Sequence, residues 1–177
     1  IPLDDQFKIR PEDYKKENGG VIFPNPNAPT GLLLPLDQVE EILEANRDVI
    51  VIVDEAYIDF GGVSALSLID RYDNLLVVQT FSKSRSLAGM RIGFAMGNPQ
   101  LIRCMQDVKY SFNSYTMNQA AIAAGTAALA DRDYFERTRK KIMDTREKAR
   151  RELRKLGFVC RDSAANFLFV THPDCPG

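Results

Sequence analysis

The sequence predicts an α/β protein, built as a three-layer αβα sandwich around a mostly parallel sheet and followed by the start of a small α+β C-terminal domain. Two observations support this prediction. Short β-rich runs alternate with helical segments along most of the chain, an order typical of strands joined by crossover helices. One run, VIVIV at residues 49–53, is apolar without alternation, as expected for a strand covered on both faces.

Four β-rich runs are predicted as strands of this sheet, at residues 20–23, 49–53, 75–79 and 92–96. The first leads into PNPNAPTG, residues 24–31, in which three prolines and a glycine exclude regular structure. If the strands are parallel, their carboxyl ends meet at one edge of the sheet, which is where α/β proteins bind ligands.

Three helices are predicted around the sheet. The first begins at Pro35 and continues to about residue 46, because apolar side chains recur there at helical spacing. The second, at residues 117–130, is rich in alanine, which permits close packing. The third, at residues 133–156, is long and heavily charged with few apolar positions, so one of its sides is expected to face water.

A change of domain is predicted within or just after the long charged helix. Gly157 is suited to end that helix, and short strands of a new unit are expected at residues 158–160 and 166–171. We therefore expect residues 1–150 to be part of the larger domain and residues 151–177 to begin the smaller one.

Composition excludes several classes of partner. The formal net charge is −1, so no electrostatic attraction to nucleic acid or to an acidic membrane is expected. No apolar run approaches the roughly 20 residues that span a bilayer. The N-terminus IPLDDQFKIR lacks the features of a signal peptide, and we expect a cytoplasmic protein. The chain does not begin with methionine, so we expect it to be a piece of a longer one.

No metal site is expected. The three cysteines, Cys104, Cys160 and Cys175, are widely spaced and show no zinc-binding pattern, so we interpret them as reduced thiols. His172 is the sole histidine and lies in the polar stretch THPDCPG, where we expect it to be solvated.

Chemically useful side chains follow three of the predicted strands. They are Asn25, Asn27 and Thr30 after the first, Asp54 and Tyr57 after the second, and Ser82, Lys83 and Arg91 after the third. Each has an ordinary structural interpretation, since Asp54 could cap a turn and most lysines and arginines are solvated surface cations. Their occurrence together at successive strand ends favours a shared site.

Three stretches of the sequence resemble the fold-type I pyridoxal-phosphate enzymes, the aspartate aminotransferase superfamily, and in particular the histidinol-phosphate aminotransferases. They are NPNAPTG at residues 25–31, VDEAYIDF at residues 53–60 and TFSKSRSLAGMRIGF at residues 80–94. A fourth, SAANFLFV at residues 163–170, resembles the opening of the small domain of that family. The resemblance covers nearly the whole chain and implies pyridoxal 5′-phosphate as cofactor.

The resemblance also implies roles for individual residues. Lys83 would bond covalently to the cofactor aldehyde and later move a proton as a general acid and base. Asp54 would face the pyridine nitrogen and keep the ring protonated, and Tyr57 would hydrogen-bond the phenolic oxygen of the ring. Asn27 is the candidate for a second donor to that oxygen. Many relatives have asparagine directly before PTG, where this chain has Ala28.

The cofactor phosphate would be held by Ser82 and Arg91, assisted by Thr80, because the planar guanidinium meets two phosphate oxygens at once. Gly89 is expected to let the backbone turn tightly before Arg91. Arg85 has no role in the family that we can assign, and we interpret it as a surface charge.

The implied reaction is transamination between histidinol phosphate and 2-oxoglutarate in histidine biosynthesis, by a homodimer. Other enzymes of the superfamily, an aromatic aminotransferase or a threonine-phosphate decarboxylase, remain alternatives, because the cofactor-binding residues are common to all of them. A nucleotide-binding module is not supported, since no glycine-rich phosphate loop follows a strand. Family members are substantially longer at both ends, so we expect this piece alone to bind the cofactor weakly and to show little turnover, or to be an inactive fragment.

Overall fold

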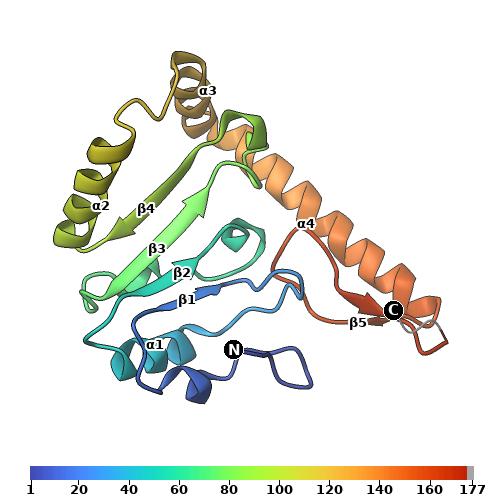
Figure 1. Ribbon diagram of the computed structural model, residues 1–177. Coiled ribbons are helices and arrows are strands. Elements are labelled where there is room, and N and C mark those ends of the chain that lie inside the picture. The colour runs from blue at the N-terminus through green and yellow to red at the C-terminus, as the bar shows by residue number, and fades with distance from the viewer. Residues whose placement is uncertain (175–177) are drawn as a thin grey trace.

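The computed structural model describes residues 1–174, in which four strands form one sheet; Figure 1 shows how the elements are arranged around it. Its strands lie in the order β1-β2-β3-β4 and comprise β1 (Val21–Pro24), β2 (Val51–Asp54), β3 (Leu75–Thr80) and β4 (Gly93–Gly97). The first three strands are parallel to one another, and β4 is antiparallel to β3. The predicted α/β class and mostly parallel sheet are therefore confirmed.

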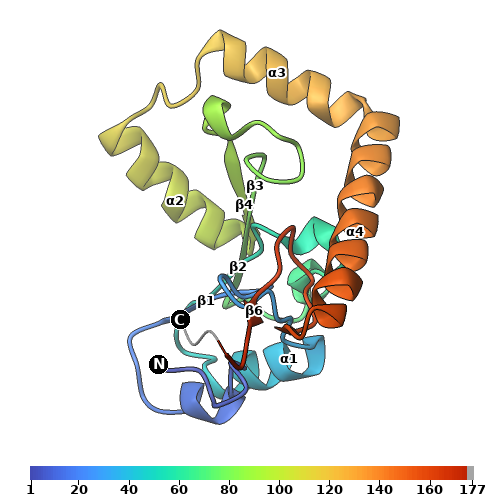
Figure 2. The same cartoon turned by 90° about the vertical axis from the view of Figure 1, so that its right-hand side faces the viewer.

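Four helices accompany the sheet: α1 (Leu36–Ala45), α2 (Pro99–Phe112), α3 (Gln119–Ala130) and α4 (Arg132–Lys155). Short 3₁₀ turns also occur, η1 (Pro11–Tyr14), η2 (Ile58–Phe60), η3 (Ala65–Leu68) and η4 (Ala88–Met90). Two-residue strands β5 (Val159–Cys160) and β6 (Val170–Thr171) form a separate antiparallel pair. Figure 2 shows α1 and α4 on one side of the sheet and α2 on the other.

The main core lies between α1 and one face of the parallel strands. Val39, Ile42 and Leu43 of α1 are fully buried against alternate residues of the strands, such as Val51 and Val53. Alternate strand residues point to one face, and burial of each such aliphatic side chain contributes about 1.5–3 kcal/mol. This packing holds α1 against the parallel strands and fixes the positions of the strand ends.

The opposite face of the same strands is less covered than the VIVIV run predicts. Ile52 is only half-buried and Ile22 is 68% exposed. On this side the described residues supply α2, which packs against β4. The strands β1 and β2 therefore alternate between a buried and an open face within residues 1–174.

Two features of the sheet region differ from the sequence prediction. The run at residues 92–96 was expected to continue the parallel sheet, but β4 runs antiparallel and its first two residues are exposed. Helix α2 was not predicted, although its start carries an ordinary signal. Asn98 caps it by accepting the N–H of Gln100, and Pro99 occupies its first turn.

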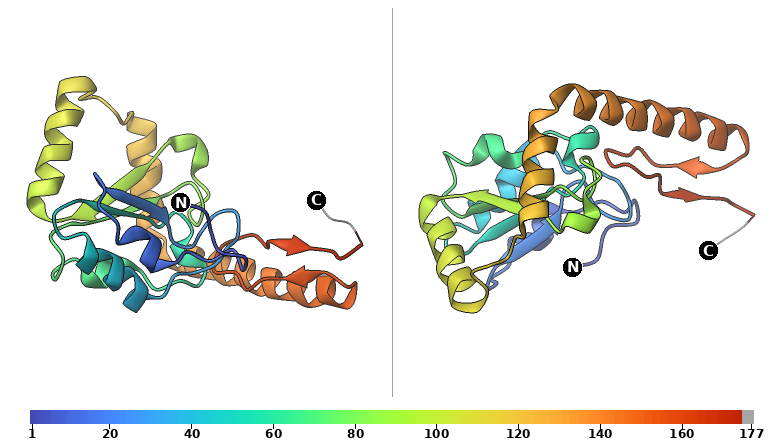
Figure 3. Two further views of the ribbon diagram at one scale, coloured as in Figure 1. Left: turned by 60° about the horizontal axis from the view of Figure 1, so that its bottom comes forward. Right: turned by 90° about the horizontal axis from the view of Figure 1, so that it is seen from above.

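The long helix α4 leads from the sheet to the β5–β6 hairpin. None of its residues is buried, which confirms the predicted water-facing side, and Gly157 ends it with φ of 90°. Figure 3 shows the end of α4 and the hairpin extending away from the sheet. His172 is not solvated as expected, because it packs edge-on against Phe158 with ring centres 4.9 Å apart.

Candidate active site

The carboxyl ends of the parallel strands form one edge of the sheet. Pro24, Asp54 and Val78 lie side by side in register across β1, β2 and β3. Because β4 is antiparallel, its beginning lies at this same edge, where Gly93 pairs with Thr80. The reversed strand thus brings the segment before Gly93, which contains Arg91, to the end of β3. The carboxyl ends of β1, β2 and β3 meet because these strands are parallel, and the reversal of β4 adds the segment with Arg91 to the same edge.

Lys83 and Tyr57 are brought together at this edge. The Lys83 Nζ lies 5.1 Å from the centre of the Tyr57 ring, within the range of a cation–π contact. The Phe167 ring meets the Tyr57 ring edge-on, with centres 5.1 Å apart. Lys83 is exposed and Tyr57 half-buried, so the amine can reach an incoming molecule while the phenol ring is held by its neighbours.

The hydroxyls of Thr80 and Ser82 lie next to each other. Their Oγ atoms are 2.9 Å apart, and Thr80 Oγ1 also accepts the N–H of Ser82 at 3.1 Å. Thr80 Oγ1 is 3.2 Å from the carbonyl oxygen of Ile92, the residue that precedes β4. These contacts tie the end of β3 to the segment that carries Arg91 and place two hydroxyl groups side by side.

Arg91 is exposed at the start of this return segment. Its Nη1 donates to the carbonyl oxygen of Ala88 at 3.0 Å, leaving the other guanidinium donors for an anion. The tight turn was predicted at Gly89, but the residue in the left-handed region is Arg91 itself, with φ of 53°. Gly89 instead lies within the turn η4.

Asp54 and Glu55 end β2 in contrasting environments. Asp54 is half-buried, and its Oδ1 accepts the N–H of Ala56 at 3.0 Å. Glu55 is 1% exposed and accepts hydrogen bonds from Ser64 Oγ at 2.6 Å, the Ala65 N–H at 2.6 Å and Gln79 Nε2 at 2.8 Å. Burial raises the pKa of the Glu55 carboxyl.

Glu55 therefore links the end of β2 to β3 and to the loop after η2, and these hydrogen bonds fix the backbone next to Asp54. Sequence reasoning missed it, because the motif VDEAY drew attention to Asp54 and Tyr57. Its available signal was a glutamate placed directly after a buried strand, where an acidic side chain requires hydrogen-bond donors.

The loop after β1 is held by its own asparagines. The Asn25 side chain accepts the N–H of Leu34 at 2.8 Å and donates to the Leu34 carbonyl at 3.0 Å. Asn27 is buried, and its Nδ2 donates to Thr30 Oγ1 at 2.7 Å. Ala28 and Pro29 are the exposed members of this loop. One hydrogen of the Asn27 amide therefore holds the loop in shape through Thr30.

The C-terminal segment 163–167 docks on this loop and on Tyr57. The Ala164 N–H donates to the Gly31 carbonyl at 2.8 Å, and Phe167 contacts the Tyr57 ring. Arg146 of α4 joins the same two regions, since its Nη1 donates to the carbonyls of Phe60 at 2.9 Å and of Ala165 at 2.6 Å. Residues far apart in the sequence therefore enclose Tyr57.

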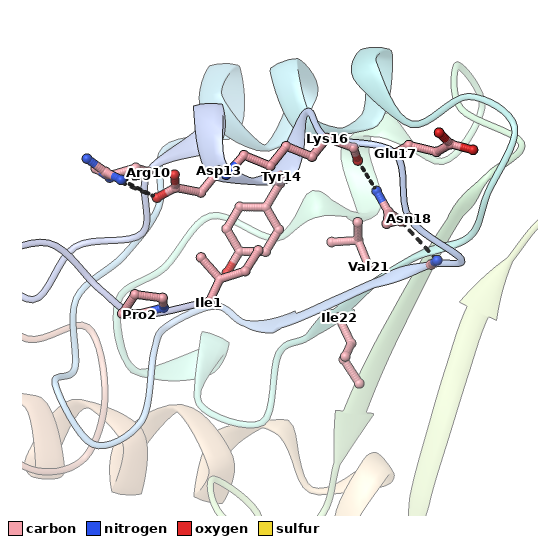
Figure 4. A pocket seen from close by; sticks show the side chains of 11 residues that line it. Ile1, Pro2, Arg10, Asp13, Tyr14, Lys16, Glu17, Asn18, Val21 and Ile22 are labelled. Atoms are coloured by element: carbon pink, nitrogen blue, oxygen red, sulfur yellow. Dashed lines mark hydrogen bonds and ion pairs between the residues drawn. The ribbon is translucent and has the colours of Figure 1, made fainter.

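A cavity of about 550 Å³ lies away from this edge. It adjoins the amino end of β1 and is lined by Tyr14, Asn18 and Ile22 among others (Figure 4). The carboxyl ends with Asp54 and Lys83 lie at the opposite end of the strands. Residues 1–174 contain no cluster of histidine, cysteine and acidic side chains suited to a metal ion, and no helix among them is long and apolar enough to cross a membrane.

The fold and this strand-end arrangement define a class of protein. The sequence profile of the family "Aminotransferase class I and II" matches residues 3–175, and the chain belongs to that family. Among its relatives is the histidinol-phosphate aminotransferase of Pseudomonas putida (strain KT2440), 60% identical over 98% of this chain and 50% of the relative. Histidinol-phosphate aminotransferase 1 of Methylococcus capsulatus is 60% identical over 98% of this chain and 48% of its own.

Solved structures agree with this assignment. The histidinol-phosphate aminotransferase from Sinorhizobium meliloti, in complex with pyridoxal-5′-phosphate, matches with a TM-score of 0.85 and 27% identity over 96% of this chain and 48% of its own. The enzyme from Clostridium acetobutylicum matches with a TM-score of 0.87 and 28% identity over 97% and 54% of the two chains. The chain spans about half the length of the curated relatives that it matches.

Proposed function

We propose that this chain forms the cofactor-binding part of a histidinol-phosphate aminotransferase that uses pyridoxal 5′-phosphate. The observation that carries the proposal is the placement of the Lys83 amine beside Tyr57, at the sheet edge where the Thr80 and Ser82 hydroxyls and Arg91 also lie. Relatives of that name share 60% of the aligned residues, which supports the same reaction between histidinol phosphate and 2-oxoglutarate.

The residues present fit the cofactor chemically. Arg91 supplies free guanidinium donors and Thr80 and Ser82 supply hydroxyls, a donor set suited to a phosphate. Asp54, at the end of β2, supplies an anion for a ring nitrogen, and Tyr57 supplies a phenol for the ring oxygen. Asn27 remains the candidate for a second donor to the ring oxygen, because the bond to Thr30 uses one of the two Nδ2 hydrogens.

When bound, pyridoxal phosphate supplies an electron sink for the bond that breaks on the substrate. The chain supplies positioning and proton transfer. Lys83 Nζ would anchor the aldehyde and then take and return the proton of the substrate carbon, a contribution of about 10²- to 10⁴-fold. The carboxylate of Asp54 would hold a proton on the ring nitrogen, and the Tyr57 hydroxyl would donate to the ring oxygen.

Covalent capture tests the site directly. The 177-residue chain is mixed with pyridoxal phosphate and reduced with borohydride, and the modified lysine is located by peptide mass. We expect the adduct at Lys83 and its loss in Lys83→Ala, whereas an adduct spread over the exposed lysines of α4 would refute the assignment.

A chimera tests the reaction. The present sequence replaces the matching half of the Pseudomonas putida relative, which supplies the remaining parts of that enzyme. We expect turnover of histidinol phosphate with 2-oxoglutarate, and none when the chimera carries Lys83→Ala. Turnover of an aromatic amino acid in preference, or release of carbon dioxide from threonine phosphate, would favour another reaction of the superfamily.

We also propose the larger organisation. Residues 1–150 would belong to the large cofactor-binding domain and residues 151–177 would begin the small domain, supported by the projection of the hairpin from the sheet (Figure 3).

A homodimer is supported by exposed apolar side chains around α2, such as Val108 at 69% and Phe112 at 90%. A cytoplasmic location is supported by Cys104 and Cys160, which are both free thiols. Light scattering on the chimera measures the assembly.

A further inference from the structure

Arg85 follows Lys83 by two residues and is attached to a different part of the chain. Its Nη1 donates to the carbonyl oxygen of Ala128 at 2.8 Å. Its guanidinium carbon lies 4.2 Å from the centre of the Phe135 ring and 5.5 Å from that of Phe81. One side chain therefore links the lysine loop, residues 81–87, to the last turn of α3 and the first turn of α4. The interpretation of Arg85 as a surface charge was wrong.

The chemistry of both partners suits a guanidinium. Ala128 is among the last four residues of α3, whose carbonyls lack donors within the helix, and a helix C-terminus attracts positive charge. The adjacent Ala127 carbonyl is used by the N–H of Asp131. A planar guanidinium can donate in its plane to one group while its face rests on an aromatic ring. Arg85 thereby gains a fixed direction, which a flexible lysine would not provide.

The lysine loop is closed on itself and held on its other side as well. The Leu87 N–H donates to the Phe81 carbonyl at 3.0 Å, and the Ser86 N–H donates to the Lys83 carbonyl at 3.1 Å. Ser84 is buried, and its hydroxyl donates a hydrogen bond to the carboxylate of Asp59, two residues after Tyr57. The two residues after Lys83 are therefore both anchored: Ser84 to the segment that contains Tyr57, and Arg85 to the corner between α3 and α4.

We propose that Arg85 is a positioning residue for Lys83: by fixing the lysine loop to the corner between α3 and α4, it sets the direction in which the Lys83 amine points. This rests on the proposed function, because its consequence is measured at the bond between Lys83 and the cofactor aldehyde. Arg85 itself needs no contact with the cofactor.

Two ligands separate positioning from general support of the fold. Pyridoxal phosphate requires the amine of Lys83, whereas pyridoxamine phosphate has no aldehyde and binds only through its ring and phosphate. In Arg85→Met we expect covalent capture at Lys83 to slow about tenfold or more, because misplacement of a reacting group by 1 Å is sufficient for that, while the Kd of pyridoxamine phosphate changes by less than about twofold.

Variants and hydrogen exchange complete the test. Arg85→Lys keeps the charge and a donor but not the planar face, and we expect an intermediate rate of capture. Arg47→Met is the matched control, because Arg47 stacks on the Tyr72 ring at 5.0 Å. Arg47 lies just before β2, at the amino end of the parallel strands and so at the opposite edge of the sheet from the lysine loop, and its variant should capture the cofactor as wild type does. Hydrogen exchange of the peptide covering residues 81–87 should accelerate in Arg85→Met and not in Arg47→Met.

The outcomes separate this proposal from the proposed function. Unchanged capture in Arg85→Met, or an equal loss of affinity for both ligands, would overturn the role of Arg85 and leave the function intact. If wild type itself forms no adduct at Lys83, the proposed function fails. Hydrogen exchange then decides whether Arg85 anchors the loop, and unchanged protection of residues 81–87 would refute it.

Discussion

Replacing Gly31 by alanine should destabilise the contact between the loop after β1 and the C-terminal segment. Gly31 has φ of 76°, a conformation that costs a residue with a Cβ about 1–2 kcal/mol. The added Cβ would lie 2.5 Å from Ser163 Oγ and 3.0 Å from Ser163 Cβ, so the segment must move. Movement weakens the 2.8 Å hydrogen bond from Ala164 to Gly31, worth about 0.5–1.5 kcal/mol.

The expected loss in the free energy of unfolding is therefore about 2–3 kcal/mol. Urea unfolding followed by circular dichroism at 25 °C measures it. Gly19→Ala is the control, because a Cβ at Gly19 meets no atom within 4 Å. Its effect should stay within about 0.5 kcal/mol.

A double-mutant cycle isolates the steric part. Ser163→Gly removes the atoms that the new Cβ would meet, although it also removes the bond from Ser163 Oγ to the Phe167 carbonyl at 2.7 Å. We expect Gly31→Ala to cost about 1 kcal/mol less in the Ser163→Gly background than in wild type. Equal costs in the two backgrounds, or a Gly31→Ala protein as stable as the Gly19 control, would refute the reasoning.

Three further substitutions test the site and its supports. Asp54→Asn in the chimera should lower turnover by about 10²- to 10³-fold, since it removes a charge aimed at the reacting system, while equilibrium dialysis finds pyridoxamine phosphate still bound. Glu55→Gln should cost most stability below about pH 4.5, the ordinary value of a glutamate pKa. Because burial raises the pKa of Glu55, the stabilising contribution of this side chain is lost as the pH rises through that pKa. Urea titrations should therefore show that the difference in free energy of unfolding between Glu55→Gln and wild type shrinks at higher pH. A difference that grows with pH would contradict burial as the cause of the shift. Arg146→Met leaves two buried carbonyls without their donor and should lower the free energy of unfolding by about 3–5 kcal/mol. The control Arg151→Met changes an exposed residue of the same helix and should cost less than about 0.5 kcal/mol. Comparable losses in the two variants would contradict the bridging role of Arg146.

The elements that the sequence predicted are those with a strong local signal. Runs of β-branched residues marked β2 and β3, and the charged pattern marked α4. The direction of β4 has no such signal, because a five-residue run reads alike in either direction and only pairing with β3 decides it. Helix α2 could have been predicted, because Asn98 and Pro99 are a common signal for the start of a helix.

The candidate site divides in a similar way. Lys83, Tyr57 and Asp54 were candidates from the sequence because their motifs resemble those of a known superfamily; the structure places Lys83 next to Tyr57, and their roles stay predictions. The links that Arg85 and Arg146 make between segments could not be predicted, because each side chain donates to carbonyls distant in the sequence. Such anchors become visible only when the fold brings the segments together.

The reversal of direction between β3 and β4 has a consequence for the lengths that this chain tolerates. The bridge of residues 81–92 is fastened at both ends by the pairing of Thr80 with Gly93, and it holds Lys83 and Arg91 eight positions apart. An insertion or deletion that shifted this pairing by one residue would turn every side chain of β4 to the other face of the sheet. Variation among homologues should therefore change the identity of side chains in this bridge far more readily than the number of its residues.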